Sequence, residues 1–259
     1  DSNKRNAIGV FDFCDLSFIN VTIKRNISEE SDTGMELDNC NLFLDQVKIH
    51  NNQMEDGELL HIDQSEGTII NCEFIENLTL DDGPSVLWMS YSDITIRNTL
   101  IADNISTDKY GAIMVHNSNL NLINSTISNN QLLDDSDRGG IVGHTATINI
   151  ENSIFWNNLP ESINLDWGAS TLSISHTNIS PESIVEDNES IINWLDGNID
   201  VDPLFVDSQN GNYALDNNSL CIDAGSSDPW SEDIDGSPLD LGFTGGSFIF
   251  LDHICKILF

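Results

Sequence analysis

Basic residues are scarce in this sequence of 259 residues, which contains 9 Lys and Arg against 43 Asp and Glu, a net charge of −34. Such a charge repels phosphate backbones and anionic lipid headgroups, which argues against nucleic-acid binding and against binding to a membrane surface. No apolar run reaches the roughly 20 residues that a membrane-spanning helix needs. Five cysteines are too few for a disulfide scaffold. Hydrophobic residues still make up 39% of the chain, which argues against wholesale disorder.

The sequence also lacks an initiating Met and a charged-then-apolar leader, since it begins at Asp1. We therefore expect a processed form or an excised piece of a longer chain. Strong acidity combined with so little lysine is common in secreted proteins. The composition thus favours an extracellular or cell-surface location.

What the sequence does have is an internal repeat. Six segments of similar pattern align, and each of them ends in an asparagine: Asn26, Asn52, Asn77, Asn104, Asn130 and Asn158. Successive asparagines are 26, 25, 27, 26 and 28 residues apart. This period is typical of the coils of a solenoid.

Apolar and polar residues alternate within each segment, which is the periodicity of a β-strand. Two strands are predicted in each segment, and they are separated by a polar column: Asn20, Gln46, Asn71, Asn98, Asn124, Asn152 and His176. Asparagine tolerates left-handed backbone angles, so this column predicts a tight bend in every coil. We also expect the side chains of this column to bond to one another as an asparagine ladder.

A third strand precedes each segment. Its predicted inward residues include Ile8 and Val10 in the first coil, and Leu165 and Trp167 in the last, where Trp167 lies against Gly143. Three parallel strands in each coil predict an all-β fold, a right-handed three-sided parallel β-helix of about seven coils.

The predicted organisation has two parts, coils in residues 1–182 and a final coil with an irregular C-terminal cap in residues 183–259. The coil pattern resembles the pectate-lyase-type parallel β-helix superfold. The runs NIDVDPLF (198–205), NGNYALDNNSLCIDAG (210–225) and DIDGSPLDLG (233–242) are similar to the closing segment of secreted bacterial surface proteins of the choice-of-anchor type. This resemblance implies a secreted surface protein, although such proteins usually continue into an anchor.

In this superfold the ligand groove usually follows the outer face of the strand before the short turn, so the resemblance implies a site there. The predicted outward residues form two columns, the first being Gly9, Glu36, His61, Trp88, Met114, Val142 and Asp166, and the second Phe11, Asp38, Asp63, Ser90, His116, His144 and Gly168. Ligand binding is expected at Glu36, Asp38, Asp63, Trp88, His116 and Asp166.

Several of these residues have two interpretations. Glu36, Asp38 and Asp63 could hold Ca²⁺, the one cofactor that the sequence suggests, or they could form a solvated acidic face. His116 and His144 could share a transition metal or act as acid and base, or they could simply be exposed. Trp88 could stack on a sugar ring, or it could be buried under the loop 79–84.

Catalysis is the weaker interpretation of this face. Lyases of the superfold need a basic residue as base and as a partner for the uronate carboxylate, and only Lys109 and Arg138, in loops, could reach the face. Hydrolases of the fold rely on clustered aspartates with a nearby histidine. The candidates for such a site are His61, Asp63, His116 and His144, and they complete neither pattern.

Cys14 and Cys40 occupy one column two residues before the repeat, in which the other coils have small residues: Ser65, Ser92, Ser118, Ala146 and Ser170. Their Cα atoms are expected about 4.8 Å apart, which is within reach of a disulfide. Two stacked buried thiols fit the same column, and we favour that interpretation.

The sequence favours a non-catalytic module for recognition of a polysaccharide or a surface protein. One alternative is a polysaccharide lyase or glycoside hydrolase that acts on an acidic polysaccharide. A second alternative is a structural subunit whose coils associate end to end into a fibre, because the first coil has no capping helix.

Overall fold

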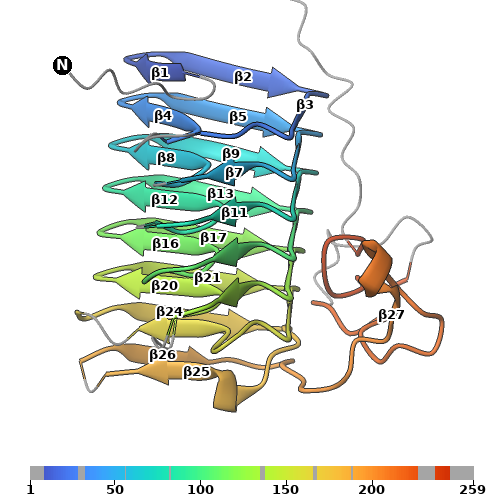
Figure 1. The fold of residues 1–259 in the computed structure, drawn as a ribbon. Coiled ribbons are helices and arrows are strands. Elements are labelled where there is room, and N and C mark those ends of the chain that lie inside the picture. The colour runs from blue at the N-terminus through green and yellow to red at the C-terminus, as the bar shows by residue number, and fades with distance from the viewer. Residues whose placement is uncertain are drawn as a thin grey trace, which may run out of the picture.

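The computed structural model describes residues 9–28, 33–55, 57–81, 83–134, 138–165, 168–187, 189–226 and 237–245. In these residues the chain consists of strands, turns and two short 3₁₀-helices, η1 (Pro181–Ser183) and η2 (Ser208–Asn210). The strands are stacked coil upon coil into a rod, and the N-terminal coil lies at one end of it (Figure 1). No helix in this part of the chain is long and apolar enough to cross a bilayer.

Three main parallel sheets run along the rod. Sheet A contains β1 (Gly9–Asp12), β4 (Met35–Asp38), β8 (Leu60–Asp63), β12 (Leu87–Ser90), β16 (Ile113–His116), β20 (Ile141–His144), β23 (Ile163–Leu165) and β25 (Ile184–Glu186). Sheet B contains β2 (Asp15–Ile19), β5 (Asn41–Asp45), β9 (Glu66–Ile70), β13 (Asp93–Arg97), β17 (Asn119–Ile123), β21 (Thr147–Glu151), β24 (Thr171–Ser175) and β26 (Ile191–Trp194). Sheet C contains β3 (Thr22–Lys24), β6 (Lys48–His50), β10 (Glu73–Ile75), β14 (Leu100–Ala102), β18 (Thr126–Ser128) and β22 (Ile154–Trp156).

A shorter sheet D extends the coils beyond sheet C, with β7 (Gln53–Met54), β11 (Leu78–Thr79), β15 (Ile105–Ser106) and β19 (Gln131–Leu132). Within the described residues, six coils have a strand in each of sheets A, B and C, and two further coils have strands in A and B alone. The predicted all-β, three-sided parallel β-helix is thus confirmed, with a coil count slightly different from the expected seven.

The core follows the alternation that the sequence predicts. Leu37, Ile62, Met89 and Val115 stack on one another in the interior of sheet A, and all four are buried. Each is followed by an outward residue, because successive side chains of a strand point to opposite faces. The interior is therefore a continuous column of apolar side chains, and sheet A presents its other residues to the outside.

The prediction of which β1 residues face inward is wrong by one residue. Val10 pairs with Glu36 on the outer face and is 61% exposed, whereas Phe11 pairs with Leu37 and packs against the core. Phe11 and Leu37 both lie three residues before the cysteine of the following turn. The position of this turn determines which residues of the strand face inward. A shift of one residue exchanges the two faces of a strand. The other predicted inward residue, Ile8, lies outside the described residues.

The predicted register of the last coil is wrong by two residues. Ile163 pairs with Ile141, so Leu165 takes the place expected for Trp167. A Cβ atom added at Gly143 would lie 2.6 Å from Cδ2 of Leu165, so the small residue does lie beside a large one. The turn that follows β23 is two residues longer than its counterparts, which displaced the alignment. Trp167 itself lies outside the described residues.

Single residues in the left-handed conformation make the corners of each coil. All seven members of the predicted bend column adopt it, with φ between 43° and 54°. Two further corner columns, after sheet A and after sheet C, adopt the same conformation. Each corner turns the chain without a loop, which keeps the coils in register.

The asparagine ladder exists, but it lies in a different column from the predicted one. It consists of the asparagines that end the repeats: Asn26, Asn52, Asn77, Asn104, Asn130 and Asn158. Nδ2 of each of the first five donates to Oδ1 of the next asparagine at 2.9–3.0 Å. In the predicted column, Asn98 donates to Asn71 at 3.4 Å, and Asn71 donates to Asp45. The ladder residues directly follow the left-handed corner after sheet C, so their side chains turn inward and meet.

A second ladder follows the corner after sheet A. There, backbone N–H groups donate to the side-chain oxygen one coil further on: Cys40 to Ser65, Ser65 to Ser92, Ser92 to Ser118 and Ala146 to Ser170, at 2.8–3.0 Å. The small inward column that contains Cys14 and Cys40 is therefore a hydrogen-bonded row that links successive coils.

The chain finally leaves the coils and forms the antiparallel strands β27 (Phe205–Asp207) and β28 (Asn212–Leu215). Tyr213 is buried against Leu100 and Ala102 of β14. Its hydroxyl donates to Asp103 at 2.7 Å and accepts from Asn129 at 2.8 Å. Further along, Cys221 and Leu241 pack on Ile154 of β22. The described part of this C-terminal segment thus lies against the outer face of sheet C, on the side of the rod (Figure 1).

Candidate functional site

The outer face of sheet A brings most of the predicted site residues together. We call its outward side chains from β4 to β20 the histidine face, which has two columns: Glu36, His61, Trp88, Met114 and Val142, and beside them Asp38, Asp63, Ser90, His116 and His144. In the first coil these columns continue to Val10 and Asp12, and not to the expected Gly9 and Phe11. Asn164 follows Val142, and the predicted Asp166 lies outside the described residues.

His61 is held by a buried carboxylate that the sequence analysis did not find. Nδ1 of His61 lies 2.5 Å from Oε1 of Glu58, whose side chain is only 6% exposed. Desolvation lowers the pKa of His61, but the hydrogen bond and the charge of Glu58, with Glu36 and Asp63, outweigh it, so the pKa is raised. Glu58 lies in the loop before β8, which has no repeat pattern to mark it.

Trp88 is half-buried. Its ring stacks on that of His61, with centroids 6.1 Å apart, and it meets Tyr110 edge to face at 5.1 Å. Met114 and Val142 complete this small cluster on the outside of the sheet. Trp88 is thus partly covered, and the residue that packs against it is Tyr110, from the loop before β16.

His116 and His144 stack as the sequence predicted, with ring centroids 4.8 Å apart. Nε2 of His116 lies 2.8 Å from Nδ2 of Asn117, and the ring of Tyr91 lies 5.9 Å from that of His116. Desolvation, and then the neighbouring His116, lower the pKa of His144. Two uncharged imidazoles can stack in this way, whereas two imidazolium ions would repel each other.

Carboxylates gather at the N-terminal end of the histidine face. Asp12, Asp38 and Asp63 pair on adjacent strands, with Glu36 beside them. Desolvation and these three neighbours raise the pKa of Asp38. Among the described residues, no group of three or more His, Cys, Asp or Glu side chains is arranged to hold a metal ion. The calcium hypothesis for Glu36, Asp38 and Asp63 therefore gains no support from the geometry.

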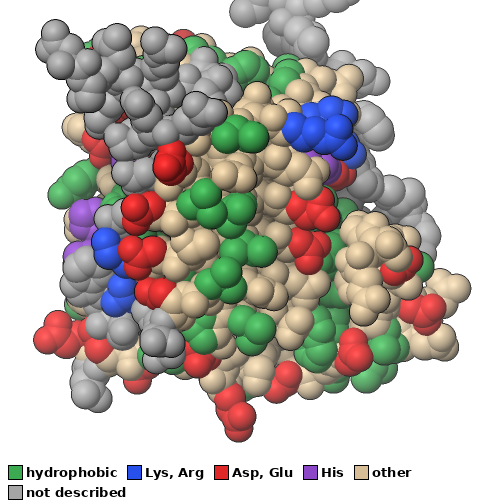
Figure 2. Space-filling model, in the orientation of Figure 1, with side chains coloured by type: hydrophobic (Ala, Val, Ile, Leu, Met, Phe, Trp, Pro, Cys, Tyr) green, Lys and Arg blue, Asp and Glu red, His purple; other side chains and the backbone are tan. Residues whose placement is uncertain are grey.

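The two basic candidates lie in loops beside this face. Lys109, between β15 and β16, has its Nζ 4.0 Å from Oδ2 of Asp108, and its backbone N–H donates to Asp134. Arg138 lies in the loop before β20. Figure 2 shows that Lys and Arg side chains occupy small areas of the face it views, while carboxylates are scattered widely.

A groove that the sequence analysis did not find runs along the corner between sheets A and B. This corner groove has a volume of about 610 Å³. Its lining is polar apart from two aromatic rings and Cys40: Phe13, Asn39, Asn41, Gln64, Ser65, Glu66, Tyr91, Ser92, Asp93, Asn117 and Asn119. A second hollow of about 350 Å³ adjoins it over sheet B, and both are lined by Asn41, Glu66 and Asp93.

The two aromatic residues of the corner groove are unusual for their position. Phe13 is 79% and Tyr91 62% exposed, and both occupy left-handed corners with φ of 48°. Residues other than glycine are uncommon in this conformation, and the other coils place Asn39, Gln64, Asn117 and Thr145 at this corner. Neither ring packs in the core, and both are exposed, so they are available for contacts outside the fold.

The fold agrees with the comparison to known families. The sequence matches the family model described as "Right handed beta helix region", over residues 1–132 and 59–220. The chain belongs to this family. A search of the curated proteins finds no match. The family membership confirms a right-handed β-helix.

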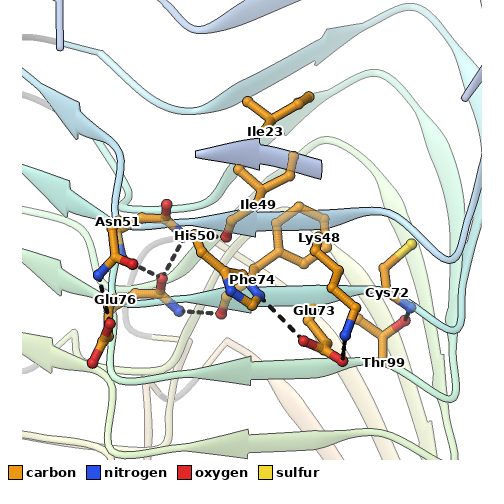
Figure 3. Close-up of polar contacts among 12 residues, drawn as sticks. Ile23, Lys48, Ile49, His50, Asn51, Cys72, Glu73, Phe74, Glu76 and Thr99 are labelled. Carbon is orange, nitrogen blue, oxygen red and sulfur yellow. Dashed lines mark hydrogen bonds and ion pairs between the residues drawn. The ribbon is translucent and has the colours of Figure 1, made fainter. Parts of the chain in front are cut away.

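The right-handed β-helix carries one further polar cluster, on the outer face of sheet C. Lys48 and His50 of β6 both reach Glu73 of β10, at 2.7 Å from Nζ to Oε1 and 3.2 Å from Nε2 to Oε2 (Figure 3). The His50 contact lowers the pKa of Glu73 most, burial opposes it, and Lys48 lowers it further. This cluster is charge-compensated, so it resembles an inter-coil tie more than a binding site.

Proposed function

We propose that this right-handed β-helix is an extracellular, non-catalytic module that binds an uncharged polysaccharide along the corner groove. The observation that carries the proposal is the pair of exposed rings, Phe13 and Tyr91, at left-handed corners of the same groove. Asn39 and Gln64 come between them on the two intervening coils.

These residue types match the two kinds of surface on a sugar. The C–H face of a sugar ring is apolar and packs on an aromatic ring, while its hydroxyls need hydrogen-bond donors and acceptors. Amides such as those of Asn39 and Gln64 supply both, and carboxylates supply acceptors. Phe13 and Tyr91 are three coils apart, a span of about 14 Å at the usual strand spacing, so a chain of several sugar units could contact both.

The charge of the groove favours an uncharged ligand over an acidic one. Glu66 and Asp93 line it, and the whole chain carries a net charge of −34. A uronate polymer would meet this negative field without a matching row of basic side chains. The acidic polysaccharide considered from the sequence is therefore a weaker fit than a neutral one.

The test is a binding measurement with soluble neutral polysaccharides and with polyuronates, by affinity electrophoresis followed by calorimetry. Phe13→Asn and Tyr91→Asn place at each corner a residue that other coils already have there, so folding is preserved. We expect either change to weaken binding by roughly tenfold or more. Thr145→Asn, at the same corner but outside the groove, is the matched control. Unchanged affinity in both aromatic variants, or a preference for polyuronates, would refute the proposal.

A second candidate function, a glycoside hydrolase, is favoured by the contact between Glu58 and His61. A histidine whose pKa is raised by a buried carboxylate can donate a proton, and Asp63 lies on the same strand. Release of reducing ends from the same polysaccharides, lost in His61→Gln, would support this candidate. If the wild-type protein releases no reducing ends, the hydrolase candidate is refuted and the binding function is the one that remains.

A further inference from the structure

The sulfur atoms of two cysteines in the first two coils lie closer together than a van der Waals contact allows. Sγ of Cys14 and Sγ of Cys40 lie 2.6 Å apart, although the structure holds both residues as thiols. This separation is shorter than the contact distance of unbonded sulfur atoms and approaches the roughly 2.05 Å of a disulfide bond. Both residues belong to adjacent coils, 26 residues apart in sequence.

The backbone around the two thiols is already fixed by the coils. The N–H of Phe13 donates to the carbonyl of Asp38 at 3.1 Å, and the N–H of Asn41 donates to the carbonyl of Cys14 at 2.8 Å. These bonds enclose Cys14 and Cys40 from both sides. Parallel neighbours about 4.8 Å apart fall within the Cα separations that disulfides accept. Bond formation thus requires no rearrangement of the chain.

We infer that Cys14 and Cys40 form a disulfide that ties the first coil to the second. In this step, both S–H bonds break, and so does the S–S bond of a low-molecular-weight disulfide, the oxidant. One S–S bond forms between the two cysteines, and the two protons and two electrons leave with the oxidant as two small thiols. Removal of the oxidant and addition of excess thiol reverse the step.

The first coil is the one that gains most from such a bond. It is bordered by one described coil, and its core residues Phe11, Leu16 and Phe18 are half-buried, whereas Leu42 and Leu44 of the second coil are buried. A coil with fewer buried apolar contacts opens more readily than a well-buried one. A covalent link removes open conformations of this coil from the ensemble.

The alternative is a pair of reduced thiols with no covalent role. Desolvation, the hydrogen bond and charge of Cys40, and the carboxylates Asp15 and Asp12 raise the pKa of Cys14 to about 11. A thiol of this kind is a poor nucleophile and a poor metal ligand at neutral pH. Oxidation is therefore slow at neutral pH and faster in mild alkali, which gives the test a kinetic signature.

The experiment starts with reduced full-length chain, incubated with oxidised glutathione at pH 7 and at pH 9. Remaining thiols are alkylated, and the non-reduced digest is analysed by mass spectrometry. We expect one linked peptide pair that contains Cys14 and Cys40, formed faster at pH 9, while Cys72 and Cys221 are alkylated after unfolding. Alkylation of both Cys14 and Cys40, or glutathione adducts alone, would overturn the inference.

A second measurement separates the disulfide from a purely structural effect of the cysteines. Hydrogen exchange of the amides in β1, β2 and β3 is compared in the oxidised and the reduced protein, and we expect slowing by roughly tenfold or more on oxidation. In the double variant Cys14→Ser, Cys40→Ser, which extends the serine row, exchange must not respond to oxidant. Equal exchange in the oxidised and reduced wild type would contradict the proposed clamp.

Discussion

Nδ2 of Asn77 donates to Oδ1 of Asn104 at 2.9 Å, and both residues are buried. The amide of Asn104 in turn donates to Asn130 and to the carbonyl of Phe74, each at 2.9 Å. One buried side chain therefore connects three coils. This arrangement satisfies every polar atom of the amide in a place where water cannot.

Asn104→Ala should destabilise the protein by about 3 kcal/mol, because it leaves polar partners on both adjacent coils buried and unpaired. Urea denaturation measures the change. The matched control is Asn149→Ala, which removes an exposed amide pair with Asn121 on sheet B and should cost less than about 0.5 kcal/mol. Equal effects of the two changes would show that the ladder contributes nothing beyond an exposed pair.

Glu58→Gln should lower the pKa of His61. The charge of Glu58 raises that pKa against the effect of burial, so its removal leaves desolvation to dominate. The pair therefore stabilises the fold below the unfolded histidine pKa of about 6.5, and this contribution is lost as the pH rises through the higher folded value. An NMR titration of His61 tests the shift, with Glu186→Gln as a distant control. An unchanged titration would show that Glu58 does not control this histidine.

Glu73→Gln should reduce stability at pH 6 by up to about 1 kcal/mol, since Glu73 contacts both Lys48 and His50. The pKa of Glu73 is lowered in the folded protein, so its contribution is present above the unfolded value of about 4.3 and is lost as the pH falls through the folded value. Urea midpoints of wild type and variant should therefore converge near pH 3. A difference that persists there would point to packing and not to charge.

Tyr213→Phe should loosen the C-terminal segment from sheet C. It removes the hydroxyl that bonds Asp103 and Asn129 and leaves both beside a buried ring, at a cost of about 1–3 kcal/mol. Limited proteolysis should then cut the segment faster, and exchange in β28 should accelerate. Tyr91→Phe, which removes an exposed hydroxyl, provides the comparison. Unchanged cleavage in Tyr213→Phe would mean that apolar contacts alone hold the segment.

Regular features of the fold could be predicted from the sequence because each coil repeats them. The recurring asparagine gives the period, the apolar alternation gives the strands, and residues such as Asn71 and Asn98 mark left-handed corners. The predicted ladder lies in the wrong column, because both columns consist largely of asparagine. Only the direction of the side chains separates them, and the corner conformation itself sets that direction.

Irregular features could not be predicted in the same way. The phase of β1 and the longer turn after β23 lie at the ends of the repeat, where an alignment has a neighbour on one side alone. The corner groove depends on Phe13 and Tyr91. The other residues of their column are polar and of several types, so the column shows no repeated pattern that would mark a groove. Glu58 reaches His61 from a loop that belongs to no repeat.

The in-register stacking has a consequence for the evolution of this chain. Within the stack, each coil pairs with the coil before it and the coil after it, and the ladder hydrogen bonds recur from coil to coil; the C-terminal segment alone packs across several coils. Duplication of one whole unit of about 26 residues before β10 would therefore lengthen the rod by about 4.8 Å and leave the contacts of the C-terminal segment in place. Deletion of a unit would shorten it by the same amount. The length of the molecule can thus change in discrete steps during evolution, while the remaining coils keep the same hydrogen bonds to their neighbours.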